Sequence, residues 1–214
     1  MDIFTQFVAI IGRMTPSHVD MLGTAFMISN DGAYATSRHV IGDNPNGLVI
    51  LAPHIQKINA YQDVTDSRCH PLNATVLEID PIKDLAIIKV DLNFTGIIPA
   101  IGSLDEIAVG ENVGIFGYPH CTEGRRVLTY QSTAIGAKIL LESNSIKSKH
   151  AVINIQSRPG QSGSMVFSPR LQKVVGLLIG TYANKFGLSL GGINPAELNQ
   201  TTHIISADYI LGMI

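Results

Sequence analysis

The chain has 214 residues, of which 45% are hydrophobic and 15% are charged, and its formal net charge at pH 7 is -2. This composition supports a packed core and argues against a disordered chain. Basic residues cluster only at Arg125-Arg126 and in the sparse pair Lys147 and Lys149, so we expect no nucleic-acid partner. The sequence indicates no particular oligomeric state.

The cellular compartment of the protein is predicted from its cysteine content and from its first apolar run. Cys69 and Cys121 are too few for a disulfide framework, and we interpret both as free thiols in a reducing environment. The run 7–11 follows Asp2 rather than a basic region and is too short for a signal peptide or a membrane span. We therefore expect a cytoplasmic protein with no membrane-spanning segment.

Short apolar runs separated by turn residues recur along the first half of the chain. The dipeptide Asp31-Gly32 lies between two of them and is a strong hairpin signal. The strands expected in this half are 7–11, 22–28, 33–36, 47–52, 72–79 and 85–90. The stretch 93–106, which contains Pro99 and Gly102, has the composition of a linker.

A second series of apolar runs follows the linker at intervals of roughly ten residues, which is typical of barrels or sandwiches rather than βαβ units. The strands expected here are 113–116, 127–133, 137–141, 151–155, 165–167, 174–180 and 202–205. Ser206 is a suitable N-cap for a short helix near 206–213. We expect an all-β protein of two similar barrels, residues 1–98 and 99–214, with that helix at the end.

Three residues stand at positions that suit nucleophilic catalysis. Ser162 lies in the glycine-rich turn Arg158 to Met165, between two apolar runs, where a hydroxyl and several backbone N–H groups can face one spot. His39 follows the end of an expected strand, which suits a general base. Asp84 opens the run 85–90, where an imidazole N–H would offset the cost of a half-buried carboxylate.

Each of these residues also has an ordinary structural interpretation. Ser162 could be a plain turn residue, His39 a capping residue, and Asp84 a charge at a strand edge that competes with Asp80 for the acidic role. Five further histidines lie in polar or turn contexts and are interpreted as surface residues: His18, His54, His70, His120 and His150. No metal or other cofactor is expected, because no histidine or cysteine pair has ligand spacing.

The arrangement of motifs goes beyond any single one, because it extends over nearly the whole chain. The motifs are Gly23 to Gly32 continuing to Val40, Asp80 to Lys89, Pro159 to Ser164, and Val174 to Leu177. In this order they resemble the chymotrypsin-fold serine proteases, most closely the HtrA/Deg-type protease domain. The resemblance implies two six-stranded antiparallel Greek-key barrels, each contributing part of an active site in the cleft between them.

The same resemblance implies roles for the three candidates. Ser162 would be the nucleophile, His39 the general base and Asp84 the residue that orients the histidine. The backbone N–H groups of Gly160 and Ser162 would form the oxyanion hole. The substrate would be a protein or peptide, cleaved through an acyl-enzyme.

Three departures from the family pattern qualify this interpretation. Gln161 occupies the position of the aspartate that pairs with a freed N-terminus in secreted trypsin-like enzymes, so zymogen activation is not expected. Ser164-Met165 replaces the usual Gly-Pro. The chain ends at Ile214, so no PDZ domain is expected.

The resemblance also places a specificity pocket. Its walls would be Gln156, Ser157, Arg158, Pro159, Ile179, Gly180, Thr181, His203 and Ile204. No acidic residue lies at the pocket base, which disfavours a substrate with lysine or arginine there. Ile204 would shorten the pocket and favour a small aliphatic residue, whereas Gln156, Ser157 and His203 leave a polar or acidic residue open.

The leading hypothesis from the sequence is therefore a serine endopeptidase. Two alternatives stay open. One is a protease-like binding module with weak or no turnover, which Ser164-Met165 keeps in consideration. The other is a viral polyprotein-processing protease of the same fold.

Overall fold

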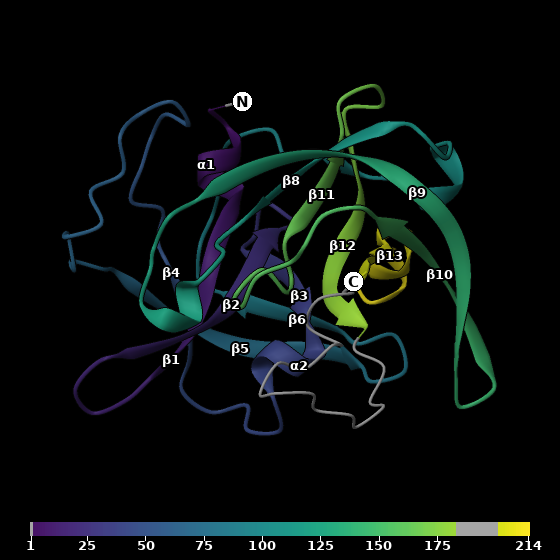
Figure 1. Ribbon diagram of the computed structural model, residues 1–214. Helices are drawn as coiled ribbons and strands as arrows, with labels where there is room; N and C mark the ends of the chain where they lie inside the picture. Colours follow the sequence, from purple (N-terminus) through teal and green to yellow (C-terminus); the bar gives the residue numbers. More distant parts are fainter. Residues whose placement is uncertain (1, 183–200) are drawn as a thin grey trace, which may run out of the picture.

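The computed structural model describes residues 2–182 and 201–214. The first half of the chain forms a closed antiparallel barrel with the strand order β1-β2-β3-β6-β5-β4 (Figure 1). Its elements are α1 (Phe4–Phe7), β1 (Val8–Met14), β2 (Val19–Met27), β3 (Ala33–Ser37), α2 (Arg38–Ile41), β4 (Leu48–Leu51), β5 (Pro71–Asp80) and β6 (Leu85–Val90).

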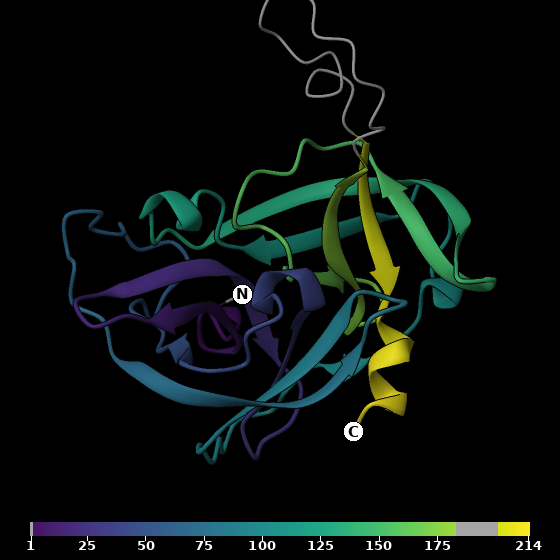
Figure 2. The same ribbon diagram turned by 90° about the horizontal axis from the view of Figure 1, so that it is seen from below.

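The second half forms another ring of strands in the order β11-β8-β9-β10-β13-β12, closed by pairing of β11 with β12, and β7 adds to β12 in parallel. The strands are β7 (Ala100–Ile101), β8 (Asn112–Gly117), β9 (Thr129–Ser143), β10 (Ile146–Ile153), β11 (Met165–Ser168), β12 (Lys173–Tyr182) and β13 (Thr201–Ser206). Three short 3-10 helices accompany them: η1 (Leu104–Glu106), η2 (Cys121–Glu123) and η3 (Ala207–Gly212). Figure 2 shows η3 extending from the end of β13 at the C-terminus.

Two apolar clusters fill the structure. The smaller one lies inside the second ring and includes Val113, Ile153, Leu178 and Ile204. The larger one fills the first barrel and continues across the junction to side chains of the second ring, such as Phe116. The junction between the two barrels is therefore apolar and belongs to the larger cluster, while the second barrel also has a cluster of its own.

The expected all-β fold of two six-stranded antiparallel barrels with a short C-terminal helix is confirmed. One expected boundary is wrong, because the strands expected at 127–133 and 137–141 form a single strand, β9. Residues 129–134 of β9 pair with β8, and residues 135–143 pair with β10. The strand changes partner between Ala134 and Ile135, and Gly136 lies at a register shift in the pairing with β10 without ending the strand.

Candidate active site

His39 and Asp84 lie at the ends of two paired strands. His39 is in α2, directly after β3, and Asp84 directly precedes β6, whose Leu85 pairs with Ser37 of β3. The Asp84 carboxylate contacts His39 twice. Its Oδ2 lies 2.5 Å from His39 Nδ1, and its Oδ1 accepts the His39 backbone N–H at 2.8 Å. This arrangement places a proton on Nδ1 and leaves Nε2 of His39 as the basic nitrogen.

Asp80, the competing acid, has a different role. Its Oδ1 accepts the backbone N–H groups of Ile82 and Lys83, and its Oδ2 pairs with Lys83 Nζ at 2.6 Å. These bonds close the turn between β5 and β6. Asp80 therefore shapes the turn, whereas Asp84, whose backbone adopts the left-handed conformation at φ 56°, faces the histidine.

The loop that carries Ser162 connects β10 to β11 and is bonded to both barrels. The Gly163 N–H donates to Leu178 O of β12 at 2.7 Å, and the Leu178 N–H donates to Ser164 O at 2.9 Å. From the first barrel, the Thr24 N–H of β2 donates to Ser162 O at 3.0 Å. These bonds fix the Ser162 backbone between the two barrels.

Gly160 occupies a position that a side chain could not share. Its φ is 88°, and a Cβ there would lie 2.6 Å from Cys121 Sγ and 2.7 Å from Tyr118 O. The Gly160 carbonyl accepts the buried Thr24 hydroxyl at 2.9 Å. Burial raises the pKa of Cys121 to about 12, so this thiol is a neutral packing group.

The buried side chain of Gln161 fixes the same loop through two hydrogen bonds. Its side chain is fully buried, its Oε1 accepts the Arg158 N–H at 2.7 Å, and its Nε2 donates to Gln131 Oε1 of β9 at 2.9 Å. An amide pair between the loop and a strand thus occupies the position at which, by the resemblance, secreted trypsin-like enzymes carry an aspartate that pairs with a freed N-terminus. The partner Gln131 was not foreseen.

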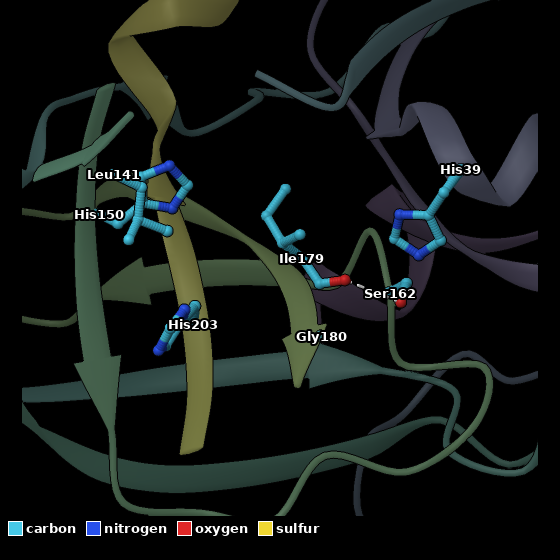
Figure 3. Close-up of a pocket in the computed structure, with 7 residues that line it drawn as sticks. All are labelled: His39, Leu141, His150, Ser162, Ile179, Gly180 and His203. Carbon is cyan, nitrogen blue, oxygen red and sulfur yellow. Dashed lines mark hydrogen bonds between the residues drawn. The ribbon is translucent and has the colours of Figure 1, made fainter. Parts of the chain in front are cut away.

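The hydroxyl of Ser162 donates to Ile179 O at 3.0 Å, as the dashed line in Figure 3 shows. Within residues 2–182 and 201–214 no hydrogen bond joins Ser162 to His39. Both side chains nevertheless line one pocket. Rotation about the Ser162 Cα–Cβ bond is therefore needed to turn the hydroxyl from Ile179 toward the histidine.

The pocket has a volume of about 390 Å³ and is lined by His39, Leu141, His150, Ser162, Ile179, Gly180 and His203. Three of these residues, Ile179, Gly180 and His203, belong to the specificity pocket expected from the sequence. Leu141 and His150 were not expected. His150 is only 8% exposed, so its interpretation as a surface histidine is wrong.

Five described residues of the expected specificity pocket are not among those that line this cavity. Ile204 is fully buried in the core of the second barrel, so it does not shorten the pocket, and the argument for a small aliphatic residue loses its basis. The backbone of Thr181 pairs with Thr202 of β13, and its side chain lies outside the described part of the structure. Four residues belong to the loop before Gly160 and do not line this pocket: Gln156, Ser157, Arg158 and Pro159.

His150 and His203, two of the three histidines that line the pocket, favour the neutral form. Burial and the neighbouring His203 lower the pKa of His150 to about 4. Burial also lowers the pKa of His203. The sequence could have revealed His150, because extending the apolar run 151–155 upstream puts Ser148, His150 and Val152 on one face of a strand.

Comparison with known proteins shows which family the chain belongs to. Residues 23–177 match the family model described as the trypsin-like peptidase domain. The chain belongs to the trypsin-like peptidase family. The match includes all three candidate residues, and the predicted family of serine peptidases is confirmed.

A curated relative and two solved structures agree with this family. The chain is 26% identical over 151 residues to the probable periplasmic serine endoprotease DegP-like of Pseudomonas fulva (strain 12-X). That match covers 69% of this trypsin-like peptidase chain and 26% of the relative, so the chain spans about a quarter of the relative's length. The expected likeness to HtrA/Deg-type protease domains is thereby confirmed.

The structural likeness covers almost the whole chain. The active form of the Rv3671c protease from M. tuberculosis superposes with a TM-score of 0.69 at 22% identity, covering 99% of this chain and 80% of that one. The HtrA-type protease AlgW with a decapeptide gives a TM-score of 0.68 at 18% identity, covering 100% of this chain and 66% of that one. At these identities the structures establish the shared fold.

The expected cytoplasmic, intracellular location is contradicted, because the Pseudomonas fulva relative is named a periplasmic protease. Few cysteines do not decide the compartment, since a protein with a sufficient core needs no disulfides in an oxidising one. Cys69 and Cys121 are both free thiols. Among the described residues, no helix has the length and apolar character required to cross a bilayer.

Proposed function

We propose that this trypsin-like peptidase domain is a serine endopeptidase that cleaves protein or peptide substrates through the triad His39, Asp84 and Ser162. The observation that carries the proposal is the double contact between Asp84 and His39, at 2.5 and 2.8 Å, beside a pocket that also contains Ser162. The AlgW structure with a bound decapeptide supports a peptide as the class of substrate.

In the first half of the reaction, the Ser162 hydroxyl turns from Ile179 O and attacks the scissile carbonyl while His39 Nε2 takes its proton. The Asp84 carboxylate stabilises the imidazolium that forms. The tetrahedral intermediate then expels the amine, which receives the proton from His39, and leaves an acyl group on Ser162. In the second half, water attacks the ester with His39 again as the base, and the proton returns to Ser162.

The backbone N–H groups of Gly160 and Ser162 are the proposed donors to the oxyanion. The neighbouring N–H groups of Gln161 and Gly163 are both engaged, by Arg158 O and Leu178 O. Among the described residues, those of Gly160 and Ser162 donate no hydrogen bond. Removing one such donor costs about 2.7–4 kcal/mol of transition-state stabilisation in enzymes of this type.

A second candidate function is a binding module without turnover. The Ser162 hydroxyl bonded to Ile179 O rather than to His39 favours it, because a nucleophile that stays in this position has no base. The two candidates differ in one rotation of a side chain. They are separated by whether Ser162 reacts covalently.

A fluorophosphonate probe tests the proposal directly. We expect labelling at Ser162 at neutral pH, and no labelling of the Ser162→Ala or His39→Ala variants. The acid is assigned by a matched pair. Asp84→Asn should lower kcat by about 10⁴-fold while the protein stays folded, because the histidine adopts the wrong tautomer, whereas Asp80→Asn should affect only the turn that Asp80 closes.

Two results would overturn parts of this proposal. Folded wild-type protein that neither reacts with the probe nor cleaves peptide pools would support the binding module. A large loss of kcat in Asp80→Asn with little change in Asp84→Asn would assign the acid to Asp80.

A further inference from the structure

The pocket beside Ser162 contains a buried polar atom without a partner. His150 is 8% exposed, and its Nδ1 has no hydrogen-bond partner among the residues that the structure describes. Its other ring nitrogen, Nε2, lies 3.0 Å from Ser148 Oγ. An unpaired buried polar atom costs free energy in the folded protein, and such atoms frequently mark a site for a ligand.

Strand pairing places this histidine on the same face as the other pocket residues. Ser148 pairs with Leu141 across β10 and β9, and Val152 pairs with His203 across β10 and β13. Because paired residues and every second residue of a strand share a face, Leu141, His150 and His203 all lie on one side of the sheet. Figure 3 shows the three side chains on this sheet, with Ile179 between them and Ser162.

We propose that His150 and His203 form a subsite for an acidic side chain, preferably glutamate, of a peptide bound beside Ser162. This inference rests on the proposed function, because it names the substrate class of the same site. Among the residues that the structure describes, those that line the pocket include three histidines and no carboxylate, lysine or arginine.

Ser148 can act as donor or acceptor toward the His150 ring, so the occupant of the subsite sets the direction of this bond. The Ser148 hydroxyl lies 3.0 Å from His150 Nε2 and 3.4 Å from Leu141 O, so the bond to the ring is the shorter. A carboxylate bound at Nδ1 would select the tautomer in which Ser148 donates to Nε2, because the ring proton then sits on Nδ1 and is donated to the ligand. A carboxylate oxygen accepts such a bond, whereas an ammonium or guanidinium group has no acceptor to offer.

The apolar lining favours glutamate over aspartate. Leu141 and Ile179 line the pocket along with the imidazoles, and they suit the two methylene groups of a glutamate side chain. A metal ion is the less suitable occupant, because no group of three His, Cys, Asp or Glu residues gathers as a metal site in the described part of the chain.

Cleavage profiling of the wild-type protein against a peptide library tests the subsite. We expect one position within four residues of the scissile bond to prefer glutamate over glutamine and leucine by roughly tenfold or more in kcat/KM, the size of one hydrogen bond to a charged group. His150→Phe should abolish this preference, which is measured as the ratio of kcat/KM between glutamate and glutamine peptides. Ser148→Ala, a milder change, should weaken it.

A matched control is His18→Gln, because His18 is an exposed histidine that pairs with Asp20 far from Ser162 in the sequence. This variant should keep the glutamate preference. Binding of acetylated tetrapeptides with glutamate, glutamine or leucine to the Ser162→Ala protein separates recognition from chemistry. Equal affinities, or a glutamate preference that survives in His150→Phe, would overturn the subsite, whereas loss of cleavage with glutamate-selective binding intact would overturn only the endopeptidase proposal.

Discussion

Ser164 carries a hydroxyl that the fold does not use. It lies two residues after Ser162, the proposed nucleophile, where the sequence departs from the Gly-Pro that the resemblance leads one to expect. Its side chain is fully buried, and its Oγ has no partner in the described part of the chain. The side chain sits against Gly117, where an added Cβ would come within 1.8 Å of Ser164 Oγ. Only a small residue fits at either position.

Ser164→Ala should therefore raise the free energy of unfolding by about 1 kcal/mol, because it removes an unsatisfied buried hydroxyl without changing the packing around it. Urea denaturation at pH 7 measures this change. The matched control is Ser168→Ala. Ser168 is also fully buried, but its Oγ accepts the Leu171 N–H at 3.3 Å, so this variant should lose stability. A loss of the same size in both variants would show that the Ser164 hydroxyl is bonded.

At the scale of single residues, the sequence indicated the candidate residues that lie in short sequence motifs. His39, Asp84 and Ser162 could be found because each lies in a short motif whose residue types carry the chemistry. The roles of His150 and Gln131 depend on partners that the fold brings from far along the chain, His203 and Gln161. A histidine or glutamine with no local motif carries no signal of such a partner.

At the scale of elements, the strand β9 connects its two neighbours in the second barrel, β8 and β10, with the loop that carries Ser162. Its first part pairs with β8, its second part pairs with β10, and Gln131 from the first part binds the buried Gln161 amide. The sequence predicted two strands here, because Gly136 and its neighbours have the composition of a turn. A change of hydrogen-bonding partner leaves no mark in an alternating pattern, so the continuous strand was not predictable.

Gln131→Leu should disturb the loop that carries Gln161 and Ser162, although Gln131 lies in a different element, β9. It would leave Gln161 Nε2 buried without an acceptor, at a cost of about 1–3 kcal/mol in unfolding free energy. The proposed oxyanion donors on either side of Gln161 should then be less well placed. We expect kcat to fall more than KM changes, because these donors act mainly on the transition state.

Gln131→Glu is the matched variant, because a carboxylate oxygen can still accept the Gln161 Nε2–H. It should keep a larger share of the wild-type kcat than Gln131→Leu. Steady-state kinetics on a peptide cleaved by the wild-type protein, together with urea denaturation, measure both effects. Equal kcat for the two variants, at equal stability, would show that the amide pair does not position the loop.

At the scale of the whole molecule, the two barrels were predictable from the two series of strands, but their contact was not. The larger apolar cluster runs from the first barrel into the junction with the second. Phe4 of α1 lies in that junction. Its ring centroid is 4.3 Å from that of Phe116 in β8 and 4.8 Å from that of Phe167 in β11. No sequence pattern indicated that the first residues of the chain pack against the second barrel.

Phe4→Ala should lower the free energy of unfolding by about 3 kcal/mol, the usual cost of removing a buried aromatic ring. Because the larger apolar cluster continues across the junction, the loss should appear in one cooperative transition that includes both barrels. Ile3→Ala is the control, since Ile3 is 44% exposed, and it should change stability by less than about 0.5 kcal/mol. Thermal unfolding followed by both circular dichroism and tyrosine fluorescence measures the transition.

The contradicting outcome is an unfolding curve of Phe4→Ala with two transitions, which would show that the two barrels are held together chiefly by this ring. The bonds from Thr24 to the nucleophile loop would then be too weak to couple them, and peptidase activity should disappear with the first transition.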